Sequence, residues 1–126
     1  MAPLRVEAAG VSHVGMKRKQ NQDHFLVEPE LKLFIVADGM GGHKGGETAS
    51  QLAVQTISEY FRGHANGAAG KGSSVSQVDS RQLLYNAIVA ANEAIHSTAQ
   101  REASLHGMGT TCTTLHFSGD RLYVGH

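Results

Sequence analysis

The chain has 126 residues, a length that suits one domain. Hydrophobic residues make up 40% of it and charged residues 17%, which is the composition of a folded protein and excludes an intrinsically disordered one. Lysine and arginine together number 11, as do aspartate and glutamate, so the net charge of zero argues against nucleic acid and anionic membranes as partners.

The N-terminal part of the chain predicts two strands joined by a loop. Valines among small residues favour a strand over residues 4–14, with an irregularity at Gly10. Residues 15–22 are polar and basic and predict a loop, and residues 23–27 predict a short second strand.

A strongly apolar strand and a glycine-rich loop follow. A turn is expected at residues 28–30, around a proline, and the run LKLFIVA over residues 31–37 is the strongest strand signal in the chain. Its last five residues are all apolar, which predicts burial on both faces of the strand. Asp38 is expected to end this strand, and residues 39–46 to form the glycine-rich loop.

Two amphipathic helices are predicted in the middle of the chain, over residues 46–61 and 81–103. Residues 62–80 between them are rich in Gly, Ala and Ser and predict a loop. Apolar residues recur along each helix at spacings of three and four, which predicts one core-facing stripe per helix. The stripe residues are Ala49, Leu52, Ala53, Ile57, Tyr60 and Phe61, then Leu84, Ala87, Ile88, Ala91, Ile95 and Ala99.

The C-terminal part predicts a β-hairpin. A β-branched strand is expected over residues 110–117, a turn at 118–120 and a return strand over 121–126. Strands followed by helices and then strands favour an α+β fold with helices packed on an antiparallel sheet. The return strand is an apolar edge of a kind that natural domains seldom leave uncovered, so we expect a truncated domain.

Cys112 is the only cysteine, so the chain cannot form an internal disulfide, and a cytoplasmic location is expected. Residues 1–10 lack the apolar core of a signal peptide, and no apolar run approaches the roughly 18 residues of a membrane span. The eight histidines show no HExxH spacing and do not predict a zinc site.

Asp38 and Gly39 form the first candidate site. A carboxylate at the end of a buried strand is held rigidly, and a glycine leaves its backbone carbonyl open to approach. Such oxygen ligands suit a hard divalent cation. The alternative is that Asp-Gly is only a turn pair. The glycines match neither GxxxxGK[ST] nor GxGxxG, which argues against a nucleotide loop.

The second candidate site lies in residues 15–23, GMKRKQNQD. Arg18 has the geometry to bind a phosphate with two parallel hydrogen bonds, and Asp23 is able to hold metal-bound water. The alternative is a solvated basic loop.

Taken together, the two motifs resemble the metal-dependent (type 2C, PPM) serine/threonine protein phosphatase family in its bacterial form. The resemblance extends to a G-[TS]-T strand entry and to a strand that leads to the family's G-D-S-R segment, and it covers nearly all of the chain. The residues that carry it are Gly15, Arg18, Asn21, Asp23, Asp38-Gly39-Met40-Gly41-Gly42-His43, Gly46-Glu47, Ala49-Ser50, Gly109-Thr110-Thr111 and Leu122-Tyr123-Val124-Gly125.

The resemblance implies a four-layer αββα fold, an antiparallel β-sandwich flanked by helices, of which residues 1–126 would be the N-terminal part of a single domain. It also implies hydrolysis of phosphoserine and phosphothreonine esters in protein substrates, with two Mn²⁺ or Mg²⁺ ions. Asp38 would bridge the ions, the Gly39 carbonyl would be a ligand, Asp23 would lie in or beside the metal shell, and Arg18 would hold the substrate phosphate.

Two positions depart from the commonest family pattern. Gln22 stands where many members have Glu, and Met40 stands where animal members have a His, although bacterial members share the Met. The G-D-S-R segment and the later aspartates that complete the metal site are expected beyond His126, so the chain alone is expected to be inactive. The competing interpretation is a non-catalytic remnant that at most binds partners.

Overall fold

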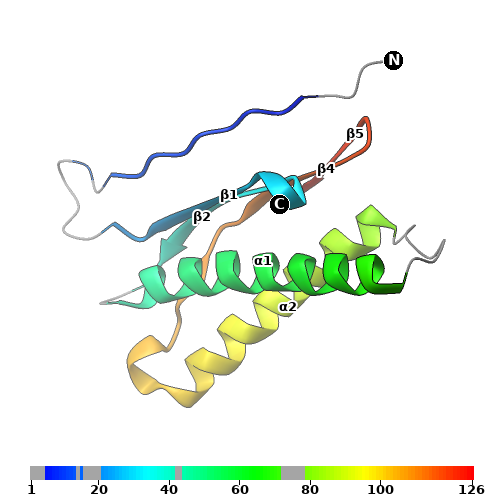
Figure 1. The fold of residues 1–126 in the computed structure, drawn as a ribbon. Helices are drawn as coiled ribbons and strands as arrows, with labels where there is room; N and C mark the ends of the chain where they lie inside the picture. The colour runs from blue at the N-terminus through cyan, green and yellow to red at the C-terminus, as the bar shows by residue number, and fades with distance from the viewer. Residues whose placement is uncertain (1–4, 14, 16–20, 42–43, 72–78) are drawn as a thin grey trace.

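The structure is a computed structural model that describes residues 5–13, 15, 21–41, 44–71 and 79–126. Two helices cover one face of an antiparallel sheet (Figure 1), which confirms the α+β prediction. The elements are β1 (Asp23–Glu28), η1 (Pro29–Leu31), β2 (Leu33–Met40), α1 (Gly45–Lys71), α2 (Ser80–Arg101), η3 (Ala103–Leu105), β3 (Gly109–Thr110), β4 (Thr113–Ser118) and β5 (Arg121–Gly125).

The sheet has the strand order β1-β2-β4-β5, and the short β3 pairs with the end of β2. Tight turns join β1 to β2 and β4 to β5. Lys32 follows η1 in the left-handed conformation, with φ of 52°, and Gly119 turns β4 into β5 with φ of 62°. The strand predicted over residues 31–37 begins at Leu33 and is central in the sheet, and the hairpin turn predicted at residues 118–120 is confirmed.

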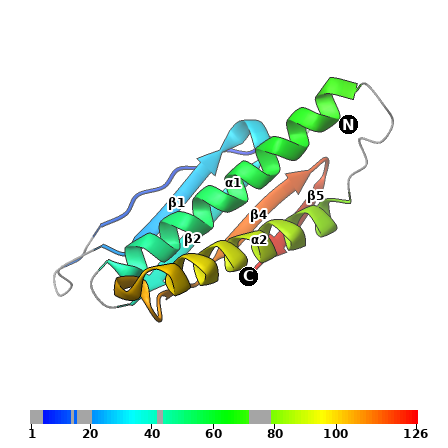
Figure 2. The same ribbon diagram turned by 90° about the horizontal axis from the view of Figure 1, so that it is seen from below.

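Side chains along β2 alternate between a buried and an exposed face. Leu33, Ile35 and Ala37 are buried beneath the helices, whereas Val36 keeps 61% of its surface exposed. The prediction of burial on both faces was therefore wrong. Among the described residues, both helices pack on the same side of the sheet (Figure 2), so alternate side chains point to the open face.

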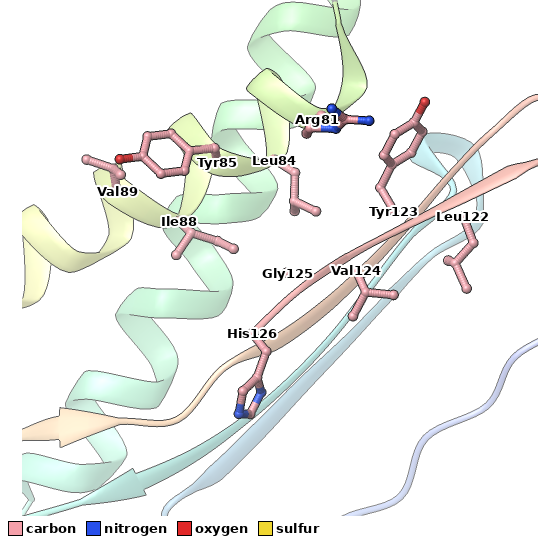
Figure 3. A pocket seen from close by; sticks show the side chains of 10 residues that line it. All are labelled: Arg81, Leu84, Tyr85, Ile88, Val89, Leu122, Tyr123, Val124, Gly125 and His126. Atoms are coloured by element: carbon pink, nitrogen blue, oxygen red, sulfur yellow. The ribbon is translucent and has the colours of Figure 1, made fainter.

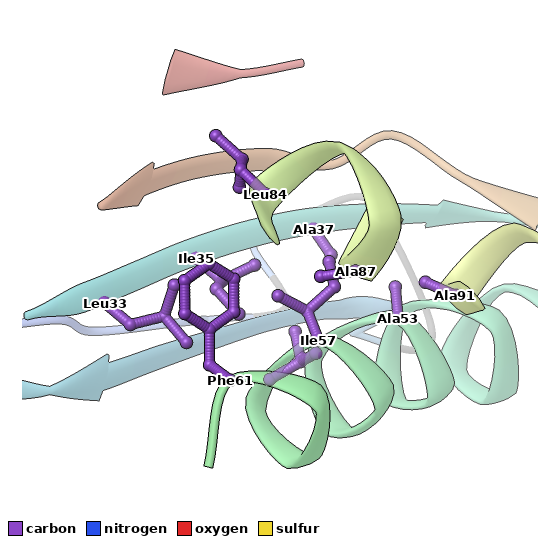
Figure 4. Close-up of a cluster of buried hydrophobic side chains, with 10 residues drawn as sticks. Leu33, Ile35, Ala37, Ala53, Ile57, Phe61, Leu84, Ala87 and Ala91 are labelled. Atoms are coloured by element: carbon purple, nitrogen blue, oxygen red, sulfur yellow. The ribbon is translucent and has the colours of Figure 1, made fainter. Parts of the chain in front are cut away.

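The core lies between the two helices and β2 (Figure 4). Helix α2 returns beside α1, and both present their apolar stripes to the sheet. Ile57 and Phe61 of α1 and Ala87 of α2 have at most 2% of their surface exposed, which confirms the predicted stripes. Neither helix in the described parts of the chain has the length and apolarity needed to cross a membrane.

The predicted strand over residues 4–14 was wrong for the part that the structure describes. Residues 5–13 form no strand and run on the side of the sheet opposite the helices (Figure 1). Gly10 approaches the ring of Phe25 so closely that an added Cβ would lie 2.3 Å from it. A strand needs a hydrogen-bonded neighbour, and the described residues provide none for this segment.

Helix α1 continues well past the predicted end at Phe61, through residues that were expected to form a loop. Once a helix exists, each added residue gains a hydrogen bond, and alanine is the best helix former, so an Ala-rich segment can extend it. Asp79 then caps α2, because its side chain accepts a hydrogen bond of 3.0 Å from the backbone N–H of Arg81.

The predicted strand over residues 110–117 is divided in two. Strand β3 ends at Thr110 and β4 begins at Thr113, and both pair with β2 at different places along its length.

A cavity of about 590 Å³ lies between α2 and β5 (Figure 3). Its walls include the apolar side chains of Leu84, Ile88 and Val124, with Arg81 and His126 also lining it. β5 has only β4 as a hydrogen-bonded neighbour among the described strands, so its other edge opens on this cavity.

Candidate metal centre

Asp23 and Asp38 lie directly opposite one another in the antiparallel pair formed by β1 and β2. Side chains of such a pair lie on the same face of the sheet, with Cβ atoms about 4.5–5.5 Å apart. Both residues are on the face turned away from the helices, where Asp38 is exposed and Asp23 is half-buried. The structure thus brings two sequence-predicted site residues together.

Two carboxylates at this separation repel one another when both are ionised, which makes the pair unfavourable in a sheet unless a positive charge offsets it. Carboxylate oxygens are also the ligands that Mg²⁺ and Mn²⁺ prefer. The donor set therefore fits a hard divalent cation. Oδ1 of Asp23 is shielded from solvent.

Gly39 continues β2 beyond Asp38, so the strand does not end at the aspartate as predicted. The residue is buried, and its backbone N–H donates a 3.1 Å hydrogen bond to the carbonyl of Gln22. A Cβ on Gly39 would lie 1.9 Å from the carbonyl oxygen of Gly46, in the first turn of α1. Glycine at this position is required for α1 to approach the end of β2 so closely.

Thr111 fixes the backbone of Asp38 from a distance of 73 residues along the chain. Its N–H donates a 2.9 Å hydrogen bond to the Asp38 carbonyl, and its side-chain hydroxyl oxygen accepts one of 3.2 Å from the Asp38 N–H. The sequence identified Thr111 only as part of the G-T-T resemblance. No spacing rule reveals such a long-range contact, although a threonine following a glycine break was a visible signal.

Ser50 is a second residue whose role the sequence did not reveal. Its hydroxyl is fully buried and donates a 2.6 Å hydrogen bond to the carbonyl of Gln22. Nδ1 of His24, in β1, lies 2.8 Å from the same Ser50 oxygen. The start of β1 is thereby joined to the first turns of α1.

Arg18, the predicted phosphate ligand, and His43 lie outside the described residues. Within the described ranges, no group of three or more His, Cys, Asp or Glu side chains is arranged to hold a metal ion. The described part of the site therefore consists of two carboxylates and backbone oxygens, a partial ligand set for two cations.

Burial shifts the pKa of two other groups, Cys112 between β3 and β4 and His116 in β4. It raises the pKa of the Cys112 thiol above its usual value, an effect that a 3.4 Å contact with the Thr114 hydroxyl partly opposes. Burial also lowers the pKa of His116. Cys112 is half-buried and packs against the core, which agrees with a structural role.

Known proteins match this chain in sequence and in structure. Residues 9–126 match the family model described as Protein phosphatase 2C. The serine/threonine protein phosphatase PstP of Mycobacterium tuberculosis is 36% identical over 123 residues, which cover 98% of this chain and 21% of PstP. The protein phosphatase PhpP of Streptococcus pneumoniae is 31% identical over 125 residues, covering 96% of this chain and 47% of PhpP.

Solved structures agree. The catalytic domain of PstP in complex with two manganese ions has a TM-score of 0.72 and 33% identity, and the match covers 90% of this chain and 44% of that domain. The chain therefore spans less than half the length of these relatives. Because the family model matches almost all of it, the chain belongs to the protein phosphatase 2C family.

Proposed function

We propose that this chain belongs to a serine/threonine protein phosphatase that hydrolyses phosphoserine and phosphothreonine esters with two Mn²⁺ or Mg²⁺ ions. The observation that supports it most directly is the register of β1 and β2, which sets Asp23 opposite Asp38 and beside Gly39. In the same family, the PstP catalytic domain was solved with two manganese ions.

Each site residue then has a distinct task. Asp38 would bridge the two ions, the Gly39 carbonyl would bind one of them, and Asp23 would act in or beside the metal shell. Arg18 would hold the substrate phosphate through two parallel hydrogen bonds. When bound, the ions would supply an activated water and offset the charge on the phosphoryl oxygens.

The proposal extends to domain organisation and location. Residues 1–126 would form the N-terminal part of a single phosphatase domain, with the remaining metal ligands on a segment that the longer relatives also possess. The partners would be phosphorylated proteins. A single cysteine, half-buried and not in a disulfide, is compatible with work in the reducing cytoplasm.

The alternative function is partner binding by a phosphatase-like domain that has no catalytic activity. The partial ligand set in the described residues favours this alternative, because few carboxylates bind Mn²⁺ or Mg²⁺ weakly. Metal stoichiometry separates the two functions, since the enzyme requires two ions and a remnant requires none.

The test is Mn²⁺ binding measured by calorimetry. Asp38→Asn should abolish binding by the protein, whereas Asp120→Asn, in the exposed turn between β4 and β5, should leave it unchanged. In a protein that carries the complete domain, Asp38→Asn should also remove nearly all turnover, and Arg18→Ala should chiefly raise KM for a phosphopeptide. Manganese-dependent activity that survives Asp38→Asn would refute the assignment.

A further inference from the structure

We propose that Gln22 is a positioning residue that holds the three elements around the acidic pair in place. It directly precedes Asp23 and lies where β1, the end of β2 and the first turn of α1 converge. The part of this inference that concerns metal binding rests on the function proposed above, and the part that concerns the contacts of Gln22 does not.

The backbone carbonyl of Gln22 accepts two hydrogen bonds from different elements. The Gly39 N–H donates one of 3.1 Å from β2, and the Ser50 hydroxyl donates one of 2.6 Å from α1. The Ser50 oxygen also contacts the Glu47 carbonyl at 3.1 Å, within the same helix. One carbonyl thus links the strand that carries Asp38 to the helix that packs against it.

The side chain of Gln22 makes a third link. Its Nε2 donates a 3.0 Å hydrogen bond to the carbonyl of Gly41, just after β2 ends. The amide also lies against Gly46, where an added Cβ would come within 2.6 Å of its Cδ and Oε1 atoms. A glycine at position 46 therefore makes the space that the Gln22 amide occupies.

Of these contacts, only the hydrogen bond to the Gly41 carbonyl requires a side-chain donor at position 22, and in this chain the Gln22 amide supplies it. An ionised Glu accepts hydrogen bonds and cannot donate one, so Gln22→Glu would place two acceptors against each other at the Gly41 carbonyl. A Glu would, however, add negative charge beside a cation site, which by Coulomb attraction alone would strengthen metal binding. The two effects have opposite signs, so this substitution separates positioning from charge.

The experiment compares the wild-type chain with Gln22→Met, which keeps the length and loses the amide, and with Gln22→Glu. Gln55→Met is the matched control. Gln55 lies exposed on α1, and its side chain donates a hydrogen bond to Glu59 of the same helix. Hydrogen exchange is measured without metal over residues 38–41 and 44–50, with α2 as the internal reference for global stability.

Both Gln22 variants should exchange about 2- to 10-fold faster over these segments, the range expected for loss of one hydrogen bond, while α2 and the control keep wild-type rates. Wild-type exchange in both variants would overturn the proposal. The proposal would also be overturned if Gln22→Met exchanged faster but bound Mn²⁺ with an unchanged dissociation constant. Gln22 would then not position the metal ligands.

The expected dissociation constant of Gln22→Met is likewise raised about 2- to 10-fold. If the wild-type chain binds no Mn²⁺ at all, the proposed function fails on that result, and hydrogen exchange still decides whether Gln22 holds the three elements together.

Discussion

Gly39 shows how a single residue determines the geometry of the candidate metal centre. A Cβ there would overlap the backbone carbonyl of Gly46, which no side-chain rotation can relieve. Gly39→Ala is therefore expected to destabilise the fold by about 1–3 kcal/mol or more, the usual cost of overpacking a tight site. Urea unfolding measures this loss of stability as a lower free energy of unfolding.

The matched control for this substitution is Gly63→Ala in α1. A Cβ at Gly63 meets no atom within 4 Å, and alanine in an exposed helix should stabilise by about 0.5–1 kcal/mol. The two glycine-to-alanine substitutions are thus predicted to change the free energy of unfolding in opposite directions. A Gly39→Ala protein as stable as the wild type would contradict the close approach of β2 and α1.

His116 makes the stability of the fold depend on pH. Its Nδ1 lies 3.3 Å from the Lys32 carbonyl and its ring packs on Phe61, with centroids 4.8 Å apart. Burial lowers its pKa below the usual 6.5, so between the two values the unfolded chain binds more protons than the folded one. The folded state should then lose stability as the pH falls below 6.5, until it passes the lowered pKa.

Thermal unfolding of the wild type and His116→Gln measures this contribution. Glutamine keeps a hydrogen-bond donor but does not titrate, so its melting temperature should fall less between pH about 8 and pH about 5. Equal falls in the two proteins would show that His116 is not the titrating group.

At the scale of elements, Ile35 lies on the core face of β2, in the buried cluster that the strand shares with the helices, with 1% of its surface exposed. Ile35→Ala should cost about 2–5 kcal/mol, because it removes buried methylene groups and leaves a cavity. Val36→Ala, on the next residue but on the open face, should cost less than about 1 kcal/mol. Similar losses in both variants, measured by urea unfolding, would contradict the alternation of faces along β2.

Local sequence patterns predicted most elements, because helix and strand periodicity record which side chains meet the core. They failed where the outcome depends on a distant neighbour. Residues 5–13 have strand-forming side chains but no partner strand among the described residues, and residues 62–71 extend α1 cooperatively despite their glycines. At the candidate site, the motif singled out Asp23, Asp38 and Gly39, and the structure places these residues side by side. The motif also contained Thr111 and Ser50, but no local pattern shows which distant residues they contact, because those contacts form only on folding.

At the scale of the whole molecule, the described residues form one sheet with helices on one face. The opposite face carries exposed apolar side chains on three strands, including Phe25, Val36 and Val124, and the edge of β5 opens on a cavity. A sheet with exposed apolar side chains and an open edge is prone to association. The relatives are more than twice as long as this chain.

From this follows the prediction that the purified 126-residue chain has little or no phosphatase activity, even with excess Mn²⁺. Two divalent cations held close together need more negative charge than Asp23, Asp38 and the Gly39 carbonyl supply. These ions also give up their bound water reluctantly. A loosely held site also loses rate steeply, because small misplacements of reacting groups are costly.

Hydrolysis of a phosphothreonine peptide measures this activity, with Asp38→Asn as the control for contaminating phosphatases. Turnover that is clear in the wild-type chain and lost in Asp38→Asn would show the prediction to be wrong. The additional carboxylates would then have to come from residues other than Asp23 and Asp38, and a second copy of this chain is the simplest source. In that case activity should rise with the square of protein concentration under dilute conditions, because two chains would be needed for each complete site.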